Sequence, residues 1–141
     1  MINEELKLTG HVTVAVNDTV VQEIPNLVVT AGKGYVASRM KDTTATAMSH
    51  MAVGTDSTAA AAGDSALGAE AGRVALTSTT VSDNTITYVA TFPAGTATAA
   101  LVEACIVNAT SGGTMLCRTV YAPVNKSASD AMTISWIITA S

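Results

Sequence analysis

Charged residues are scarce in this chain, and their scarcity narrows the classes of function to consider. Only 13% of its 141 residues are charged, about half the usual share in globular domains. The basic residues are scattered, and Lys33, Arg39 and Lys41 are their only local concentration. Because binding to a phosphate backbone needs a clustered positive patch, nucleic acid is not expected as a partner. A surface with so few charges suits burial against protein partners, although an ordinary Thr/Ser-rich β surface has the same composition.

Long apolar runs are also missing. No stretch reaches the ~20 residues of a membrane helix, so no membrane contact is expected. The start of the chain, Met1 to Leu6, has no basic segment followed by an apolar core, so no signal peptide is visible and folding in a cytoplasm is expected. The length fits one domain spanning 1–141, with residues 1–8 as an extended N-terminal arm.

Residues that carry chemistry are few and are not grouped. His11 and His50 have no Cys, Asp or Glu nearby at the spacing of metal ligands. Asp56, Asp64 and Glu70 are too far apart to form a calcium loop, and no Gly-x-Ser-x-Gly motif is present. We therefore expect no catalytic residue, no metal site and no cofactor, and an enzyme is disfavoured.

Alternating apolar and polar side chains predict that most of the chain is β-strand. Val12, Val14 and Val16 share one face of the first strand, and residues 132–139 show the most regular alternation. With no βαβ rhythm, the pattern predicts an all-β antiparallel sandwich, jelly-roll or immunoglobulin-like, of about eight strands. The predicted strands span residues 8–16, 19–24, 48–55, 73–82, 85–92, 101–108, 115–121 and 132–139.

One short helix and one long loop interrupt the predicted strands. Thr30 is a suitable N-cap for a helix over residues 31–41. Residues 56–70 are rich in Ala, Gly and Ser and predict a long loop, a kind of segment that often forms a binding surface. The candidate contacts with partner proteins lie in this loop and in the N-terminal arm: Met1, Ile2, Leu6, Asp56, Asp64, Leu67 and Glu70.

The predicted hairpin of residues 101–121 contains two candidate residue pairs. Cys105 and Cys117 are equally distant from Ser111 at the turn, so they could face each other as a disulfide or as two free thiols. A reducing cytoplasm favours the free thiols. Glu103 lies inside a strand, nearly opposite Arg118, and is interpreted as one partner of a cross-strand ion pair.

Several stretches of the sequence share packing and turn patterns with a known family. These stretches are Met51-Ala52-Val53-Gly54-Thr55, residues 63–70 with Arg73-Val74-Ala75, residues 88–95, Leu101-Val102-Glu103-Ala104, residues 113–120 and Val124-Asn125-Lys126. In them the chain resembles a family of small virion proteins of tailed bacteriophages. The resemblance covers about residues 26–139, while the first hairpin matches less well.

The resemblance implies a structural role in the virion, with assembly in the host cytoplasm. The favoured expectation is a capsid decoration (cement) subunit that forms a trimer or another homo-oligomer and stabilises the lattice of the major capsid protein. A tail, baseplate or fibre component is the alternative, although the chain has none of the repeats that fibre subunits often show. A receptor- or glycan-binding module is less favoured because only 4% of the residues are aromatic.

Overall fold

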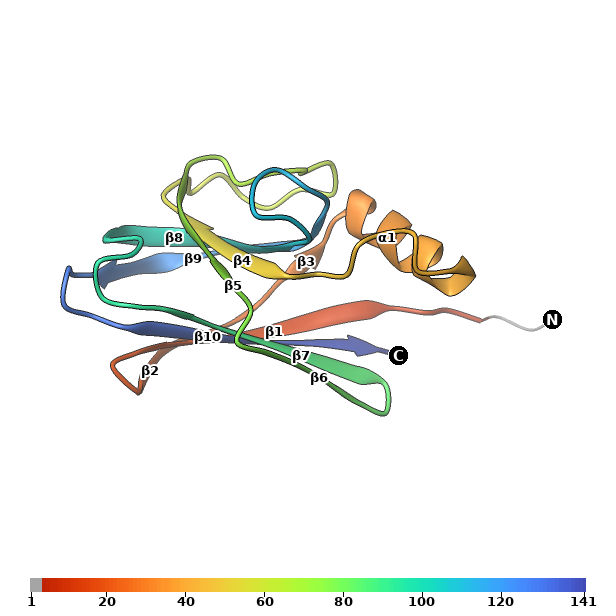
Figure 1. The fold of residues 1–141 in the computed structure, drawn as a ribbon, viewed down its shortest axis with the longest axis horizontal. Helices are drawn as coiled ribbons and strands as arrows, with labels where there is room; N and C mark the ends of the chain where they lie inside the picture. The colour runs from red at the N-terminus through yellow and green to blue at the C-terminus, as the bar shows by residue number, and fades with distance from the viewer. Residues whose placement is uncertain (1–3) are drawn as a thin grey trace.

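The computed structural model describes residues 4–141 as two five-stranded antiparallel sheets stacked face to face (Figure 1). Within these residues there are ten strands, so the predicted all-β sandwich is confirmed with two more strands than expected. The β1 sheet has the order β2-β1-β10-β7-β6 and contains β1 (Leu8–Val16), β2 (Thr19–Pro25), β6 (Ser78–Ser82), β7 (Thr85–Phe92) and β10 (Met132–Ala140). The β8 sheet has the order β3-β9-β8-β4-β5 and contains β3 (Leu27–Val28), β4 (His50–Gly54), β5 (Glu70–Ala75), β8 (Ala99–Val107) and β9 (Met115–Lys126).

The core lies between the two sheets and is built from the inward-facing residue of each alternating pair. Trp136 on β10 is fully buried, with Val12 of β1 and Tyr88 of β7 as its neighbours in register. Met51 and Ile106 contribute to the same cluster from the β8 sheet. Each large apolar side chain buried in this way stabilises the fold by about 1.5–3 kcal/mol, so the alternation read from the sequence fixes which face of each strand points inward.

The chain crosses from one sheet to the other at Leu76 and Thr77, where the sequence predicted one continuous strand over residues 73–82. That prediction is wrong, because β5 and β6 belong to different sheets. The Leu76 N–H donates to the Ser49 carbonyl at 2.9 Å, and the Thr77 N–H donates to the Val89 carbonyl at 2.7 Å. The backbone thus stays hydrogen-bonded through the crossing without a glycine or proline turn, which is why the sequence gives no sign of it.

Helix α1 (Thr30–Lys41) lies at the end of the sandwich where β1 begins and β10 ends (Figure 1). Thr30 is already helical and Val29 occupies the N-cap position without a side-chain hydrogen bond, so the predicted Thr30 cap is wrong. Gly32 is the buried residue of the helix, and a Cβ built there would lie 2.0 Å from the Leu116 carbonyl oxygen. The helix is therefore held by a close approach of its backbone to β9, which only glycine permits.

Two glycines in this helix give a matched test of the packing. Gly32→Ala should lower the free energy of unfolding by about 1–3 kcal/mol because the new methyl group meets the β9 backbone. Gly34→Ala should raise it by about 0.5–1 kcal/mol, because Gly34 has open space around it and alanine favours the helix. Urea denaturation of both variants measures the difference, and equal stability of the two would contradict the close approach.

Candidate functional site

Residues 55–69 join β4 to β5 and lie over the outer face of the β8 sheet (Figure 1). Arg118 on β9 fixes this loop from beneath. Its Nη1 donates to the Thr58 carbonyl and to Asp64 Oδ2, both at 3.0 Å. Only 2% of Arg118 is exposed, so its guanidinium group acts inside the chain.

Glu103 lies beside Arg118 and is fully buried. Its Oε2 is 3.5 Å from Arg118 Nη2 and accepts the backbone N–H of Asp56 at 2.9 Å. Arg118 is opposite Cys105 in the ladder, so Glu103, two residues before Cys105, is its diagonal neighbour on the same face. The ion pair expected from the sequence is thus present, and it also holds the start of the loop.

Two aspartates of the loop complete this cluster around one guanidinium group. Asp56 Oδ2 lies 3.9 Å from Arg118 Nη2, and its Oδ1 accepts the backbone N–H and the hydroxyl of Thr58. Those two hydrogen bonds, the backbone one first, hold the pKa of Asp56 below its ordinary value. Asp64 Oδ2 also accepts the N–H of Ala61 at 2.9 Å. The loop is therefore tied both to itself and to the sheet.

The far end of the loop is held by a second ion pair and by apolar packing. Glu70 Oε1 is 2.7 Å from Arg73 Nη2, and Arg73 Nη1 donates to the carbonyls of Ala109 and Gly112. Leu67 is half-buried against a small apolar cluster on the outer face of the β8 sheet. That cluster consists of Val29, Ala52, Cys105, Val107 and Met115. All four loop residues predicted as partner contacts, Asp56, Asp64, Leu67 and Glu70, therefore interact within the chain.

The two cysteines lie on opposite faces of the β8 sheet and are free. A register shift between Ile106 and Val107 places Cys117 opposite Ile106 and moves Cys105 opposite Arg118. The alternative of a disulfide is thereby corrected, because a one-residue shift turns a facing pair to opposite sides. Burial raises the pKa of Cys105 to about 12 and raises that of Cys117 well above its ordinary value.

The outer face of the β1 sheet is the largest feature that the sequence reasoning missed. Figure 1 shows no segment of residues 4–141 covering it. Its apolar positions are Ala15, Val20, Pro25, Val89 and Ile137. Most of its other positions are hydroxyl-bearing: Thr9, Thr13, Ser78, Thr80, Ser82, Thr85, Thr87, Thr91, Thr133, Ser135 and Thr139. The signal was available, since these are the polar members of the alternating pattern.

Ionisable side chains are almost absent from this outer face. At its paired strand positions within residues 4–141, the two that occur are His11 and Glu23, whose Nε2 and Oε1 atoms lie 3.4 Å apart. Covering the face therefore removes very little charge from water, and hydroxyl groups can donate or accept hydrogen bonds across an interface. The arrangement suits contact with another protein surface.

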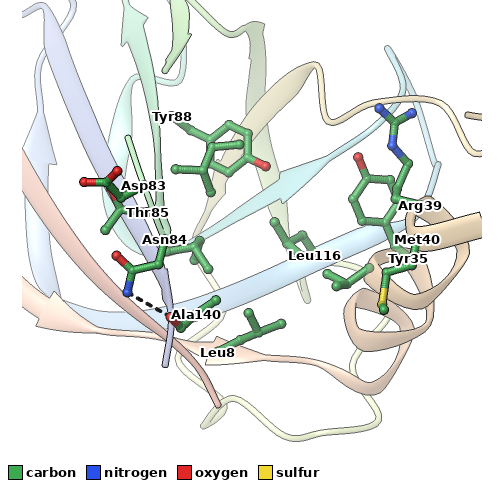
Figure 2. Close-up of a pocket in the computed structure, with 13 residues that line it drawn as sticks. Leu8, Tyr35, Arg39, Met40, Asp83, Asn84, Thr85, Tyr88, Leu116 and Ala140 are labelled. Atoms are coloured by element: carbon green, nitrogen blue, oxygen red, sulfur yellow. Dashed lines mark hydrogen bonds between the residues drawn. The ribbon is translucent and has the colours of Figure 1, made fainter. Parts of the chain in front are cut away.

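Residues 6–9 and helix α1 form a second surface. Leu6 is 71% exposed, whereas Met1 and Ile2, the other predicted contacts, lie outside the described residues. A cavity of about 480 Å³ opens beside the helix, with Tyr35 and Arg39 of α1 on one side and Tyr88 of β7 on the other (Figure 2). Burial, followed by the nearby Tyr35, raises the pKa of Tyr88 well above its ordinary value.

Clusters of metal ligands and membrane-spanning helices are absent from residues 4–141. Those residues contain no group of three or more His, Cys, Asp or Glu side chains arranged to hold a metal ion. None of the described helices is long and apolar enough to span a membrane. Comparisons of the chain with protein-family models, curated proteins and solved structures found no match.

Replacing Arg118 tests the tie between loop and sheet. Arg118→Met should lower the free energy of unfolding by about 3–5 kcal/mol because Glu103 becomes an uncompensated buried charge. Adding Glu103→Gln should recover at least about 1 kcal/mol, since the amide oxygen still accepts the Asp56 N–H. Lys41→Met on exposed α1 is the control, with a change within about 0.5 kcal/mol. Denaturant unfolding measures the free energy of unfolding of all three variants. An Arg118→Met variant as stable as the wild type would contradict the role of Arg118 in holding the loop on the sheet.

The raised pKa values of Cys105 and Cys117 predict that their thiols are inert in the folded protein. Because the thiolate is the reactive form, a disulfide reagent at pH 8 should label neither cysteine within minutes. The unfolded chain in guanidinium chloride should release two equivalents at once, matching its two cysteines. Rapid labelling of the native protein would refute the buried positions, and fewer than two equivalents after unfolding would indicate a disulfide.

Proposed function

We propose that this protein is a structural subunit of a bacteriophage virion, a capsid decoration protein that binds the major capsid protein lattice through the outer face of the β1 sheet. The observation that carries the proposal is the composition of that face, where His11 and Glu23 are the ionisable side chains among the paired positions of residues 4–141. Exposed monomer surfaces usually intersperse many charges of both signs, which keep molecules apart.

The size of the face supports a specific contact. The sheet has five strands, which at about 4.8 Å spacing and with roughly seven residues each cover on the order of 600 Å². That area approaches the ~800 Å² that each partner buries in a standard interface. Exposed Val20 and Ile137 add apolar contact area on the same face.

The assignment to a virion is supported by the resemblance to small virion proteins of tailed bacteriophages. Most of the resembling residues fall on elements that build the β8 sheet and its covering loop, namely β4, residues 63–70, β5 and the β8-β9 hairpin, while residues 88–95 fall on the end of β7 in the β1 sheet and the turn after it. On a capsid the same contact recurs at every lattice site, so a modest affinity per contact is multiplied through effective concentration.

Charges placed on the face should block attachment to the particle. The double variant Thr87→Lys/Ser135→Lys puts two unpaired ammonium groups at the centre of the sheet, and its occupancy on capsids should fall about tenfold or more. The assay is co-sedimentation with capsids of the encoding phage assembled without this protein. Thr110→Lys/Ser111→Lys, in the exposed turn after β8, carries the same added charge and should bind like the wild type.

Circular dichroism should first show that both double variants are folded. Wild-type occupancy of the Thr87→Lys/Ser135→Lys variant would refute the face as the contact. Wild-type protein that binds tails and not capsids would replace the decoration role with the tail role.

A further inference from the structure

An apolar groove runs along helix α1. The cavity of about 480 Å³ beside β7 and β10 adjoins a second one of about 460 Å³ beside residues 6–9. The two cavities share Leu8, Val36 and Met40 in their walls. Met40 is 83% exposed and Leu6, which lines the same second cavity, is 71% exposed, and exposed apolar side chains that are contiguous in this way mark contact sites.

The rim of this groove is predominantly basic. Lys33 and Arg39 lie along α1 and line the groove, and Lys41 follows at the end of the helix. Among residues 4–141, neither Lys33 nor Arg39 forms an ion pair, and Arg39 donates to the carbonyl of Ala45. Asp83 on the opposite wall is the one carboxylate that lines the cavities. The groove therefore suits an extended segment that is both apolar and acidic.

The N-terminal segment of this same chain has that chemistry. Its sequence, Met1-Ile2-Asn3-Glu4-Glu5-Leu6, combines three apolar residues with two adjacent carboxylates. Glu4, Glu5 and Leu6 are exposed. Lys7 is fixed by reciprocal backbone hydrogen bonds with Ser141, at 2.7 and 2.9 Å. The exposed residues 4–6 therefore start from an anchored point, with Glu5 Oε2 3.5 Å from Lys7 Nζ in a solvent-exposed ion pair.

We propose that residues 1–6 of one copy bind in the α1 groove of a second copy, with Leu6 and Ile2 against the apolar walls and Glu4 and Glu5 toward Lys33 and Arg39. This inference rests on the proposed function, because it supplies the self-association that a decoration subunit needs. An extended segment of six residues spans roughly 20 Å, about the length of the 12-residue helix α1 along which the groove runs. A contact of arm into groove joins two different surfaces, and such a contact forms a ring, such as the expected trimer, when the rotation between copies closes.

Exchanging the charges tests the contact in solution. Glu4→Lys/Glu5→Lys and Lys33→Glu/Arg39→Glu should each weaken self-association about tenfold, because attraction becomes repulsion. Combining the four substitutions should restore the affinity to within about threefold of the wild type. Sedimentation equilibrium of the full chain over a range of concentrations gives the association constants. The control is Thr110→Lys/Ser111→Lys, which should associate like the wild type.

Each other outcome overturns the inference. A wild-type protein that stays monomeric at all concentrations would do so, as would a fourfold variant no stronger than the two double variants. A small molecule found in the groove by native mass spectrometry, with the arm dispensable for association, would identify a ligand site instead.

The proposed function fails separately. The Thr87→Lys/Ser135→Lys variant should have the same oligomer mass in solution as the wild type but a lower occupancy on capsids. The arm variant Glu4→Lys/Glu5→Lys should instead show a lower oligomer mass in solution, even in the absence of capsids. Arm variants with wild-type mass and reduced capsid occupancy would refute the arm-into-groove contact and leave the decoration role standing.

Discussion

The structure depends on one constraint, which is that every strand has two faces and the core accepts one of them. Trp136, Phe92 and Ile134 take the inner positions of the β1 sheet and meet Met51, Leu101 and Ile106 from the β8 sheet. Once these faces are joined, two outer faces remain, and the chain treats them differently. The outer face of the β8 sheet is covered by residues 55–69, tied down through Arg118. The outer face of the β1 sheet is left open. The surface available to a partner therefore depends on which of the two outer faces residues 55–69 cover.

The charges follow the same division. Glu103, Asp56 and Asp64 gather around Arg118 beneath the loop, where they maintain the fold. The open face carries hydroxyl groups in their place. A low overall charge therefore does not mean that charge is unimportant here; it means that much of the charge is used inside the chain. The basic rim of the α1 groove is the exception, and it is what distinguishes that surface from the open face.

The sequence predicted the sandwich and most strand positions because alternation has a period of two residues, which a single sequence displays directly. It predicted the Glu103–Arg118 pair from the similar distance of the two residues to the hairpin turn, and the register shift at Ile106 is what places both on one face of the sheet. It failed where the outcome depends on register or on distant contacts. A bulge at Ile106 separated Cys105 from Cys117, and a hydrogen-bonded crossing at Leu76 divided one predicted strand into two. Neither event needs a glycine or a proline, so neither leaves a sequence signal. The alternating pattern showed the polar residues of each strand, but it did not show that strands distant in sequence join them into one open face.

The most direct test of the account is a cryo-EM map of the intact particle that contains this protein. We predict that the outer face of the β1 sheet, centred on Ser135 and Thr87, is buried against the capsid shell, while residues 55–69 keep their place over the β8 sheet. A map in which that face is open to solvent, with the contact made by the loop instead, would contradict it.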